Sequence, residues 1–336
     1  MQNSNDLLRV LTREGVLANV SVRYWRGCKK LNAEDLGLDP SDVSDRLISL
    51  GHKRLLPKDA TATLALIEGR SHALIETNTF PFLNGLAHFV PNPKLSEITE
   101  RLKGLEAEFW DAKEQFIEKY GALRDSAARE WETMARKLVS DPERLVATIE
   151  ASFPTVGQMD RYFGYDVQLF QIAVPERLGL DMLALGDQEQ LIQSRQQAAQ
   201  EAARKIRRDV EGFVADCVAT LREQTANLCQ EMLQSINSSE TGVHQKTLNR
   251  LVRFIDQFKS MNFMNDQVME QQLENVRKEL LSKTAEEYRD STAARNRLTQ
   301  GLAQLRDAAT RLARQEATEL VLRFGELGRR KFNLAA

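Results

Sequence analysis

The side chains that most often carry chemistry are few and scattered in this sequence. Its four histidines have no sequence-local pattern that joins them to carboxylates or cysteines; they are His52, His72, His88 and His244. A catalytic or metal-binding cluster would have to be assembled by the fold from His52, His72 and His88. Isolated histidines are more often surface residues or hydrogen-bonded core residues. We therefore expect no metal site and no catalytic histidine.

Short motifs with a known mechanism are missing as well. The sequence contains no G-x-x-x-x-G-K-[ST], G-x-G-x-x-G, H-E-x-x-H, G-x-S-x-G or C-x-x-C, the patterns of nucleotide, zinc and hydrolase sites. Asp39, Asp42 and Asp45 are spaced three apart, but they lack the glycine and the closing glutamate of a calcium loop, so turn and helix-cap roles are expected. We predict no catalytic residue, no cofactor and no metal.

The three cysteines are Cys28, Cys217 and Cys229, an odd number without close pairing. This pattern is typical of a reducing compartment. Cys28 precedes Lys29 and Lys30, whose charges could lower the pKa of its thiol, but an ordinary packed or exposed thiol is the favoured interpretation. Cys217 falls on an apolar helix seam, so we expect it in a core.

Two basic clusters could contact phosphates of a nucleic acid. They are Arg204, Lys205, Arg207 and Arg208 in one, and Arg329, Arg330 and Lys331 in the other. With 46 basic against 48 acidic residues the net charge is -2, which gives no long-range attraction to polyanions. A solvated helix face is therefore the favoured interpretation. The basic, apolar-faced helix expected over 243–264 likewise fits a bundle helix better than a membrane-surface helix.

The composition indicates the elements that must position any site. Only 17 of 336 residues are glycine and 8 are proline, no proline follows Pro175, and aromatic residues make up 7%, all of which favours helix. No run of eighteen apolar residues occurs, and the N-terminus lacks the basic and apolar segments of a signal peptide. We therefore expect a cytoplasmic protein with no membrane span.

Three short strands and several helices are predicted. Apolar and polar residues alternate over 16–25, an aromatic-rich run over 80–90 indicates a bulged strand or a small hairpin, and 165–174 is a third such run. A helix is predicted over 58–77. Apolar residues at steps of three and four then predict four further helices and one short one. Their ranges are 97–139, 142–151, 187–236, 243–264 and 267–331.

The long helices carry one apolar stripe each, so they must cover it with one another or with a second chain. The predicted fold is mainly α: an elongated antiparallel helical bundle or coiled-coil stalk, with a small α+β head that holds a three-stranded sheet. The head would be 1–97, completed by 152–186. The first long helix and a short one would occupy 98–151, and a proline-free helical stalk 187–336. Homo-oligomerisation is one way to cover the stripes.

The head resembles a known family in three sequence blocks. They are VSVRYWRGCKKLNAEDLGL, then LGHKRLLP from Leu50, and FVP from Phe89 ahead of a long polar helix. They resemble a bacterial family of unknown function, often encoded on mobile elements beside a MoxR-type AAA ATPase and a von Willebrand factor A domain protein. Trp25, Gly27, Lys29, Gly51 and Lys53 carry the match. The resemblance implies those two proteins as partners and supplies no catalytic residues.

The function expected from these features is a non-enzymatic scaffold or adaptor in a multi-protein bacterial assembly, of mobile-element or phage-related origin, that works with an AAA ATPase. Its partner-binding region would be an exposed patch around Trp25, Lys29, Lys53 and Phe82. One alternative is a nucleic-acid-binding coiled-coil protein that uses the cluster at 204–208. Another is a membrane-active helical effector that exposes Leu251, Ile255 and Phe258. An enzyme with a fold-assembled site is a third.

Overall fold

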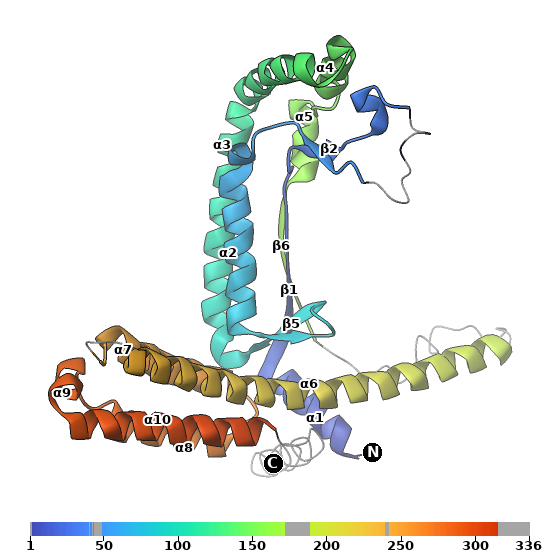
Figure 1. Cartoon of the computed structure of the whole chain (residues 1–336). Helices are drawn as coiled ribbons and strands as arrows, with labels where there is room; N and C mark the ends of the chain where they lie inside the picture. Colours follow the sequence, from blue (N-terminus) through green and yellow to red (C-terminus); the bar gives the residue numbers. More distant parts are fainter. Residues whose placement is uncertain are drawn as a thin grey trace. The chain divides into compact units, whose positions relative to one another are not determined.

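The computed structural model of the chain describes residues 2–39, 41, 43, 49–171, 189–238 and 242–314 (Figure 1). Four sequence predictions lie outside the described residues: the turn and cap roles of Asp42 and Asp45, the basic cluster Arg329, Arg330 and Lys331, the end of the last predicted helix, and the head segment 172–186.

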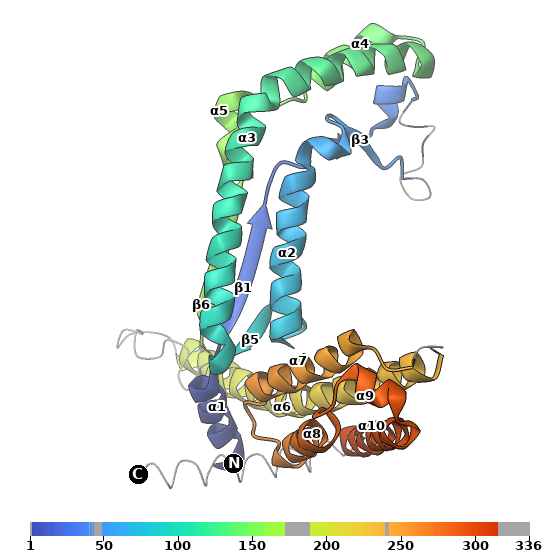
Figure 2. The same ribbon diagram turned by 90° about the vertical axis from the view of Figure 1, so that its left-hand side faces the viewer.

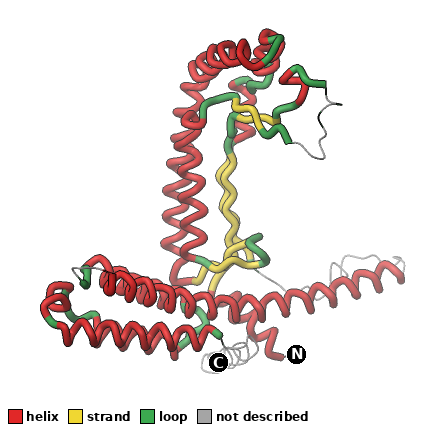
Figure 3. The backbone as a smooth tube through the Cα atoms, viewed as in Figure 1, coloured by secondary structure: helices red, strands yellow, loops and turns green. Residues whose placement is uncertain are grey.

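The mainly α class is confirmed, and helix far outweighs strand (Figure 3). The helices are α1 (Gln2–Glu14), α2 (Ala62–Asn78), α3 (Asn92–Leu138), α4 (Pro142–Glu150), α5 (Val156–Met159), α6 (Glu189–Ser238), α7 (Gln245–Met261), α8 (Gln267–Leu280), α9 (Ala285–Asp290) and α10 (Thr292–Ala313). The strands are β1 (Gly15–Arg23), β2 (Cys28–Lys30), β3 (His52–Arg54), β4 (Phe80–Phe82), β5 (Ala87–Pro91) and β6 (Gly164–Phe170). Short 3-10 turns at Ala33–Leu36, Lys58–Thr61 and Asp160–Tyr162 complete the set.

The three predicted strand regions do join one sheet, which has four strands in the order β4-β5-β1-β6. The run 80–90 forms a hairpin and not a bulged strand, because Leu83, Asn84 and Gly85 all take a positive φ and close a tight turn. A second sheet, which the sequence analysis missed, pairs β2 with β3 in antiparallel register, with Cys28 opposite Arg54, Lys29 opposite Lys53 and Lys30 opposite His52.

The chain forms two compact units that interleave in sequence. Unit 1 contains 1–18, 78–96 and 169–336, and unit 2 contains 19–77 and 97–168. This division differs from the expected head and stalk, because α3 from residue 97 onward belongs with α2 and β6, whereas α6 to α10 belong with α1 and the β4–β5 hairpin. Each unit is described by itself below.

In unit 2, α2 and α3 run along one face of the ribbon that β6 forms with the later part of β1 (Figures 1 and 2). The apolar stripe of α3 is covered there by aromatic side chains. Phe109 lies 5.7 Å from Tyr165 between ring centroids, and the Trp25 ring lies 6.3 Å from Phe116 and 5.7 Å from Tyr120. The sequence analysis expected the later long helices to cover this stripe, whereas residues of unit 2 itself bury it.

Unit 1 is a helical bundle in which α6 lies alongside α10 (Figure 1). Helix α7 contacts α8 in the same bundle. Its core joins these helices to α1 and the β4–β5 hairpin. Phe213 of α6 contacts that hairpin through edge-to-face aromatic pairs, 4.8 Å from Phe82 and 5.7 Å from Phe89 between ring centroids. The hairpin therefore buries its aromatic residues against the bundle.

The last predicted helix, 267–331, is wrong as one continuous element. Its described part is divided into α8, α9 and α10. Thr284 forms a capping box with Glu287 and starts α9, and the Ser291 hydroxyl accepts a hydrogen bond from the Ala294 amide and starts α10. Such caps satisfy the amides that have no partner inside a helix. The pattern Thr284-x-x-Glu287 was visible in the sequence and was overlooked.

Candidate interaction groove

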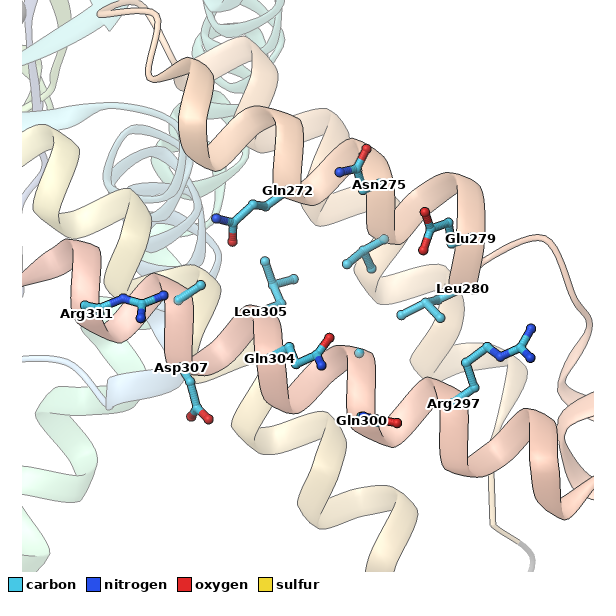
Figure 4. A pocket seen from close by; sticks show the side chains of 13 residues that line it. Gln272, Asn275, Glu279, Leu280, Arg297, Gln300, Gln304, Leu305, Asp307 and Arg311 are labelled. Atoms are coloured by element: carbon cyan, nitrogen blue, oxygen red, sulfur yellow. The ribbon is translucent and has the colours of Figure 1, made fainter.

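A concave site lies in unit 1 between α8 and α10 (Figure 4). It is an open groove with a volume of about 720 Å³. Its lining residues are Gln272, Asn275, Val276, Glu279 and Leu280 from α8, and Arg297, Gln300, Gly301, Gln304, Leu305, Asp307, Ala308 and Arg311 from α10. We call it the α8–α10 groove.

The floor and the rim of the α8–α10 groove differ in chemistry. The floor consists of buried apolar side chains; they are Val276, Leu280, Leu305 and Ala308. The rim is polar and exposed, with carboxamides on both helices and one acid and one arginine near each end. The groove thus offers a narrow apolar strip between two rows of hydrogen-bonding groups.

Close helix contact at one point sets the shape of the groove. Gly301 of α10 lies against Leu280 of α8, and a Cβ atom added to Gly301 would clash with Leu280 Cδ1. The Tyr288 hydroxyl of α9 donates a hydrogen bond to the Leu280 carbonyl, and burial raises the pKa of this phenol. The end of α8 is therefore held against α9 and α10, and the groove extends along α10 from Arg297 to Arg311, past this contact.

Ion pairs hold the other side of α8 on α7. Lys259 Nζ lies 2.6 Å from Glu274 Oε1, and Arg277 Nη1 lies 2.6 Å from Asp256 Oδ1. The hydrogen bond from Lys259 lowers the pKa of Glu274, and the one to Asp256 raises the pKa of Arg277. These charged residues face away from the groove, because none of them is among its lining residues. The ion pairs between α7 and α8 therefore do not use the groove side chains.

The three histidines that only the fold could join into a cluster lie on three different elements. His52 is exposed on β3, and His72 is exposed on α2. His88 belongs to unit 1, where its Nδ1 atom lies 3.1 Å from Thr79 Oγ1. Within the described ranges, no three His, Cys, Asp or Glu side chains lie close enough together to hold a metal ion.

The predicted partner-binding patch is wrong for three of its four residues. Trp25 is buried in the aromatic cluster of unit 2, and Phe82 is buried in unit 1 against Phe213. Both are aromatic residues whose burial stabilises a core. Lys53 is also buried, and only Lys29, directly opposite on β2, is exposed as predicted.

Lys53 is buried because it has an acidic partner. Its ammonium lies 2.7 Å from Asp35 Oδ1, with 4% of the Lys53 side chain and 6% of the Asp35 side chain exposed. The other carboxylate oxygen of Asp35 accepts a hydrogen bond from the Asn32 amide at 2.9 Å. The pair ties β3 to the turn that begins at Ala33. Gly27 and Gly51 take positive φ values of 58° and 75° beside these strands, as the turns predicted there require.

The basic cluster of α6 is partly neutralised. Lys205 Nζ lies 2.7 Å from Asp209 Oδ2, one turn along the helix. Arg207 is half-buried, whereas Arg204 and Arg208 are exposed. Arg204 and Arg208 lie one turn apart, so two arginines on the same face remain available to an anion.

Two of the three cysteines are core residues. Cys217 is buried as predicted, and burial raises the pKa of its thiol well above the ordinary value. Burial also raises the pKa of Cys229 to about 12, although the Arg306 cation opposes the shift. Cys28 is half-buried on β2. Neither thiol of α6 forms a thiolate near neutral pH, so neither is a reactive nucleophile.

The apolar face of α7 points into unit 1. Leu251, Ile255 and Phe258 are almost fully buried in its core, as in an ordinary bundle helix. No helix in the described part of the chain is both long enough and apolar enough to span a membrane.

The sequence analysis missed the groove, although a signal for it was present. Gln272, Asn275, Gln300 and Gln304 flank the apolar positions of their helices. Carboxamides beside an apolar stripe fit a helix boundary that meets both water and a partner. Only the pairing of α8 with α10 brings these two rows of carboxamides to one groove.

Comparison with known proteins gives one match. Residues 12–307 match the model of a family described as "Protein of unknown function (DUF3150)". No match was found among curated proteins or among solved structures.

Proposed function

Because the chain belongs to the family described as "Protein of unknown function (DUF3150)", a description that assigns no activity, we propose a function from the geometry of the chain itself. The protein is a non-enzymatic adaptor in a multi-protein assembly. It holds an amphipathic helix of a partner protein in the α8–α10 groove. The observation that carries this proposal is the apolar floor between two polar rims.

The dimensions of the groove support a helix as occupant. From Arg297 to Arg311 the α10 wall is about 21 Å long at 1.5 Å per residue. That length equals roughly four helical turns. Bundles commonly seat a third helix in the groove between two packed helices, with its apolar stripe on the floor.

The rim specifies the polar face of that helix. Glu279 and Arg297 lie toward one end of the groove, and Asp307 and Arg311 toward the other. Asp307 already pairs with Arg306 at 2.7 Å. A partner helix with both acidic and basic side chains and with long polar residues would satisfy this rim, whereas a strongly charged helix of one sign would not.

The assembly follows from the family resemblance of the N-terminal blocks. We propose a bacterial assembly of mobile-element or phage-related origin, in which an AAA ATPase of the MoxR type and a von Willebrand factor A domain protein are the partners. The groove would receive a helix of one of these two proteins. This assignment rests on the sequence resemblance and on the helix-binding geometry together.

Site-specific photo-crosslinking of the full chain tests the proposal. A photoreactive amino acid at Gln304, on the groove rim, should crosslink to the purified ATPase or to the von Willebrand factor A protein. The matched control is Asn296, which is exposed on the same helix but does not line the groove. Equal or absent crosslinking at the two positions with both proteins would overturn the proposal.

A second variant checks that the groove itself is used. Gln304→Trp would fill the groove, and Asn296→Trp would add the same side chain elsewhere on α10. We expect Gln304→Trp to weaken the retained complex at least tenfold, since a blocked hot spot costs more than about 1.4 kcal/mol. Asn296→Trp should leave the affinity unchanged, and a loss with both variants would contradict a role of the groove.

A nucleic-acid-binding role is the second proposal, because Arg204 and Arg208 are exposed on one face of α6. Retention on DNA should then fall with rising salt and disappear in the double variant Arg204→Glu, Arg208→Glu. Unchanged retention in that variant would exclude this face as the nucleic-acid contact.

A further inference from the structure

We propose that unit 2 carries a separate docking site for an acidic peptide segment that contains one bulky apolar side chain. The site joins an apolar niche on α3 to a basic face of the β2–β3 sheet. It is independent of the α8–α10 groove, because all of its residues belong to the other unit.

The niche is a small cavity of about 210 Å³ between α3 and the segment that follows β3. Its walls are mostly apolar: Leu55, Leu56, Pro57, Ala127, Trp131 and Met134, with Arg54 and Glu130 at the rim. Pockets for whole small ligands begin at about 300 Å³. The niche therefore suits one large apolar side chain and not a complete cofactor.

The walls of the niche are held in place by backbone hydrogen bonds. The indole Nε1 of Trp131 donates to the Arg54 carbonyl at 2.9 Å. The Leu55 and Leu56 amides both donate to the Gly27 carbonyl, at 2.7 and 3.3 Å. Preorganised walls reduce the entropy that a ligand loses on binding.

Apolar surface continues beyond the niche along α3. Met134 is 49% exposed and Leu138 is 53% exposed. Together with Trp131 they are spaced by three and four residues, so they lie on one side of the helix. A peptide anchored in the niche could therefore extend along this strip.

The register of the β2–β3 sheet gathers cations beside the niche. Arg54 is opposite Cys28, and the next pair on the same face is His52 opposite Lys30. Lys30, His52 and Arg54 are all exposed. Arg54 belongs to both features, since its residue also lines the niche. We call Lys30, His52 and Arg54 the basic face.

No acid neutralises the basic face within the chain segments that the structure describes. The nearby carboxylate of Asp35 is already paired with Lys53 on the opposite face. Among the described residues, no ion pair joins Lys30, His52 or Arg54 to an acid. Lys30 and Arg54 carry like charges on one face of this small sheet and repel each other. An acidic partner would remove that repulsion, which is the charge complementarity that identifies the ligand.

Glu130 determines the direction in which an acidic ligand can lie in the site. It lies on the α3 side of the niche, opposite the rim that Arg54 provides. The acidic residues of the ligand should therefore lie toward β2 and β3, with the apolar side chain in the niche. Removal of the Glu130 charge should strengthen binding, and removal of the Arg54 charge should weaken it.

An acidic peptide fits these features better than a nucleic acid does. The niche beside the Trp131 indole has room for one side chain, whereas proteins that bind single-stranded nucleic acids stack successive bases on several aromatic side chains. The basic face is short, with three side chains, whereas single-stranded nucleic acids bind along an extended basic groove.

The test uses the full chain and fluorescent synthetic peptides. The probe is a short glutamate-rich peptide with one central phenylalanine; one control peptide has serine in place of the phenylalanine, and a second has lysine in place of each glutamate. We expect binding of the probe that weakens at high salt. Each control peptide should bind at least tenfold more weakly. Equal binding of the serine peptide would overturn the role of the niche.

Variants separate the two halves of the site. Arg54→Glu should weaken binding of the probe about tenfold or more, and Met134→Asp should do the same through the niche wall. Glu130→Gln should strengthen it severalfold. The control Lys119→Glu changes an exposed lysine elsewhere on α3 and should have no effect. All four positions are exposed, so circular dichroism should show unchanged folding.

One further outcome decides between ligand classes. The competitor is a thymidine oligonucleotide. The peptide proposal is wrong if this oligonucleotide binds as tightly as the probe and competes with it, and if its binding is weakened by Arg54→Glu but not by Met134→Asp. The site would then bind polyanions in general. Crosslinking at Gln304 is unaffected by any of these results, so failure here is distinguishable from failure of the adaptor function.

Discussion

Arg222 and Asp266 form a fully buried ion pair in the core of unit 1, with Nε of Arg222 2.7 Å from Oδ2 of Asp266. Arg222 lies on α6, and it also donates to the Leu312 carbonyl in the last turn of α10 at 2.8 Å. Asp266 caps the first turn of α8 through the Met269 amide. One side chain of α6 thus ties together two helix ends that would otherwise have unpaired backbone groups.

Removal of one member of this pair should be severe. Arg222→Met leaves the Asp266 carboxylate buried without its cation, so we expect a loss of about 3–5 kcal/mol in the free energy of unfolding. Urea denaturation followed by circular dichroism measures it. The exposed pair of Lys205 and Asp209 is the control, and Lys205→Ala should cost at most about 1 kcal/mol. Similar losses in both variants would contradict the assigned burial.

We expect replacement of Gly301 by alanine to destabilise the contact between α10 and α8. Glycine to alanine inside a helix normally stabilises by about 1 kcal/mol, but a Cβ atom here would clash with Leu280, and overpacking costs about 1–3 kcal/mol. We predict a net loss for Gly301→Ala. Gly104→Ala on α3, where nothing lies within 4 Å of the added atom, should stabilise. Thermal unfolding of both variants tests the prediction: Gly301→Ala should lower the melting temperature and Gly104→Ala should raise it.

Lys53 and Lys29 should differ in their effect on stability although they are opposite one another in the sheet. Lys53→Ala leaves the buried Asp35 carboxylate without a cation and should cost about 3 kcal/mol or more. Lys29→Ala removes an exposed side chain and should stay within about 0.5 kcal/mol. Chemical denaturation of the two variants gives the comparison. A large loss of stability in Lys29→Ala would contradict the assignment of Lys29 as exposed and Lys53 as buried.

The Cys229 thiol should make stability fall in alkali. Burial raises its pKa from 9.0 to about 12 in the folded protein, so above pH 9 the unfolded chain ionises first and is favoured. The buried thiol therefore contributes fully to the free energy of unfolding below pH 9, and this contribution is lost progressively as the pH rises toward 12. From pH 8 to pH 10 this thiol should remove about 1.4 kcal/mol.

Urea denaturation at both pH values measures that loss, and Cys229→Ala serves as the reference. The variant should lose less stability between pH 8 and pH 10 than the parent chain by about the same 1.4 kcal/mol. Other groups titrate equally in the two proteins and cancel in the difference. An identical loss in both proteins would refute the shifted pKa.

The helices were predicted well from the sequence because their signals are local. The apolar spacing of α3 and α6 depends on residues within a few turns. The structure confirms both helices. The division at Thr284 was equally local and shows that a capping box outweighs a continuing apolar stripe.

Burial of single residues could not be predicted in this way. Lys53 was expected at the surface because lysine is rarely buried, and its burial depends on Asp35, which the β2–β3 sheet and its connecting turn bring to it. Trp25 is likewise covered by Phe116 and Tyr120, about a hundred residues later in the chain. No local pattern contains such partners.

The sequence by itself determined the long helices and the strand regions of the four-stranded sheet, because backbone preference, caps and apolar periodicity act over a few residues. It did not indicate α1 or the short strands β2 and β3. The tertiary structure alone decided which apolar helix face packs against which partner. It therefore decided that the apolar face of α3 is covered within unit 2 and that α8 and α10 leave a groove between them. The physical reason is that an apolar face gains free energy only when another segment covers it and removes its surface from water. In this protein the covering segment comes from a distant part of the chain.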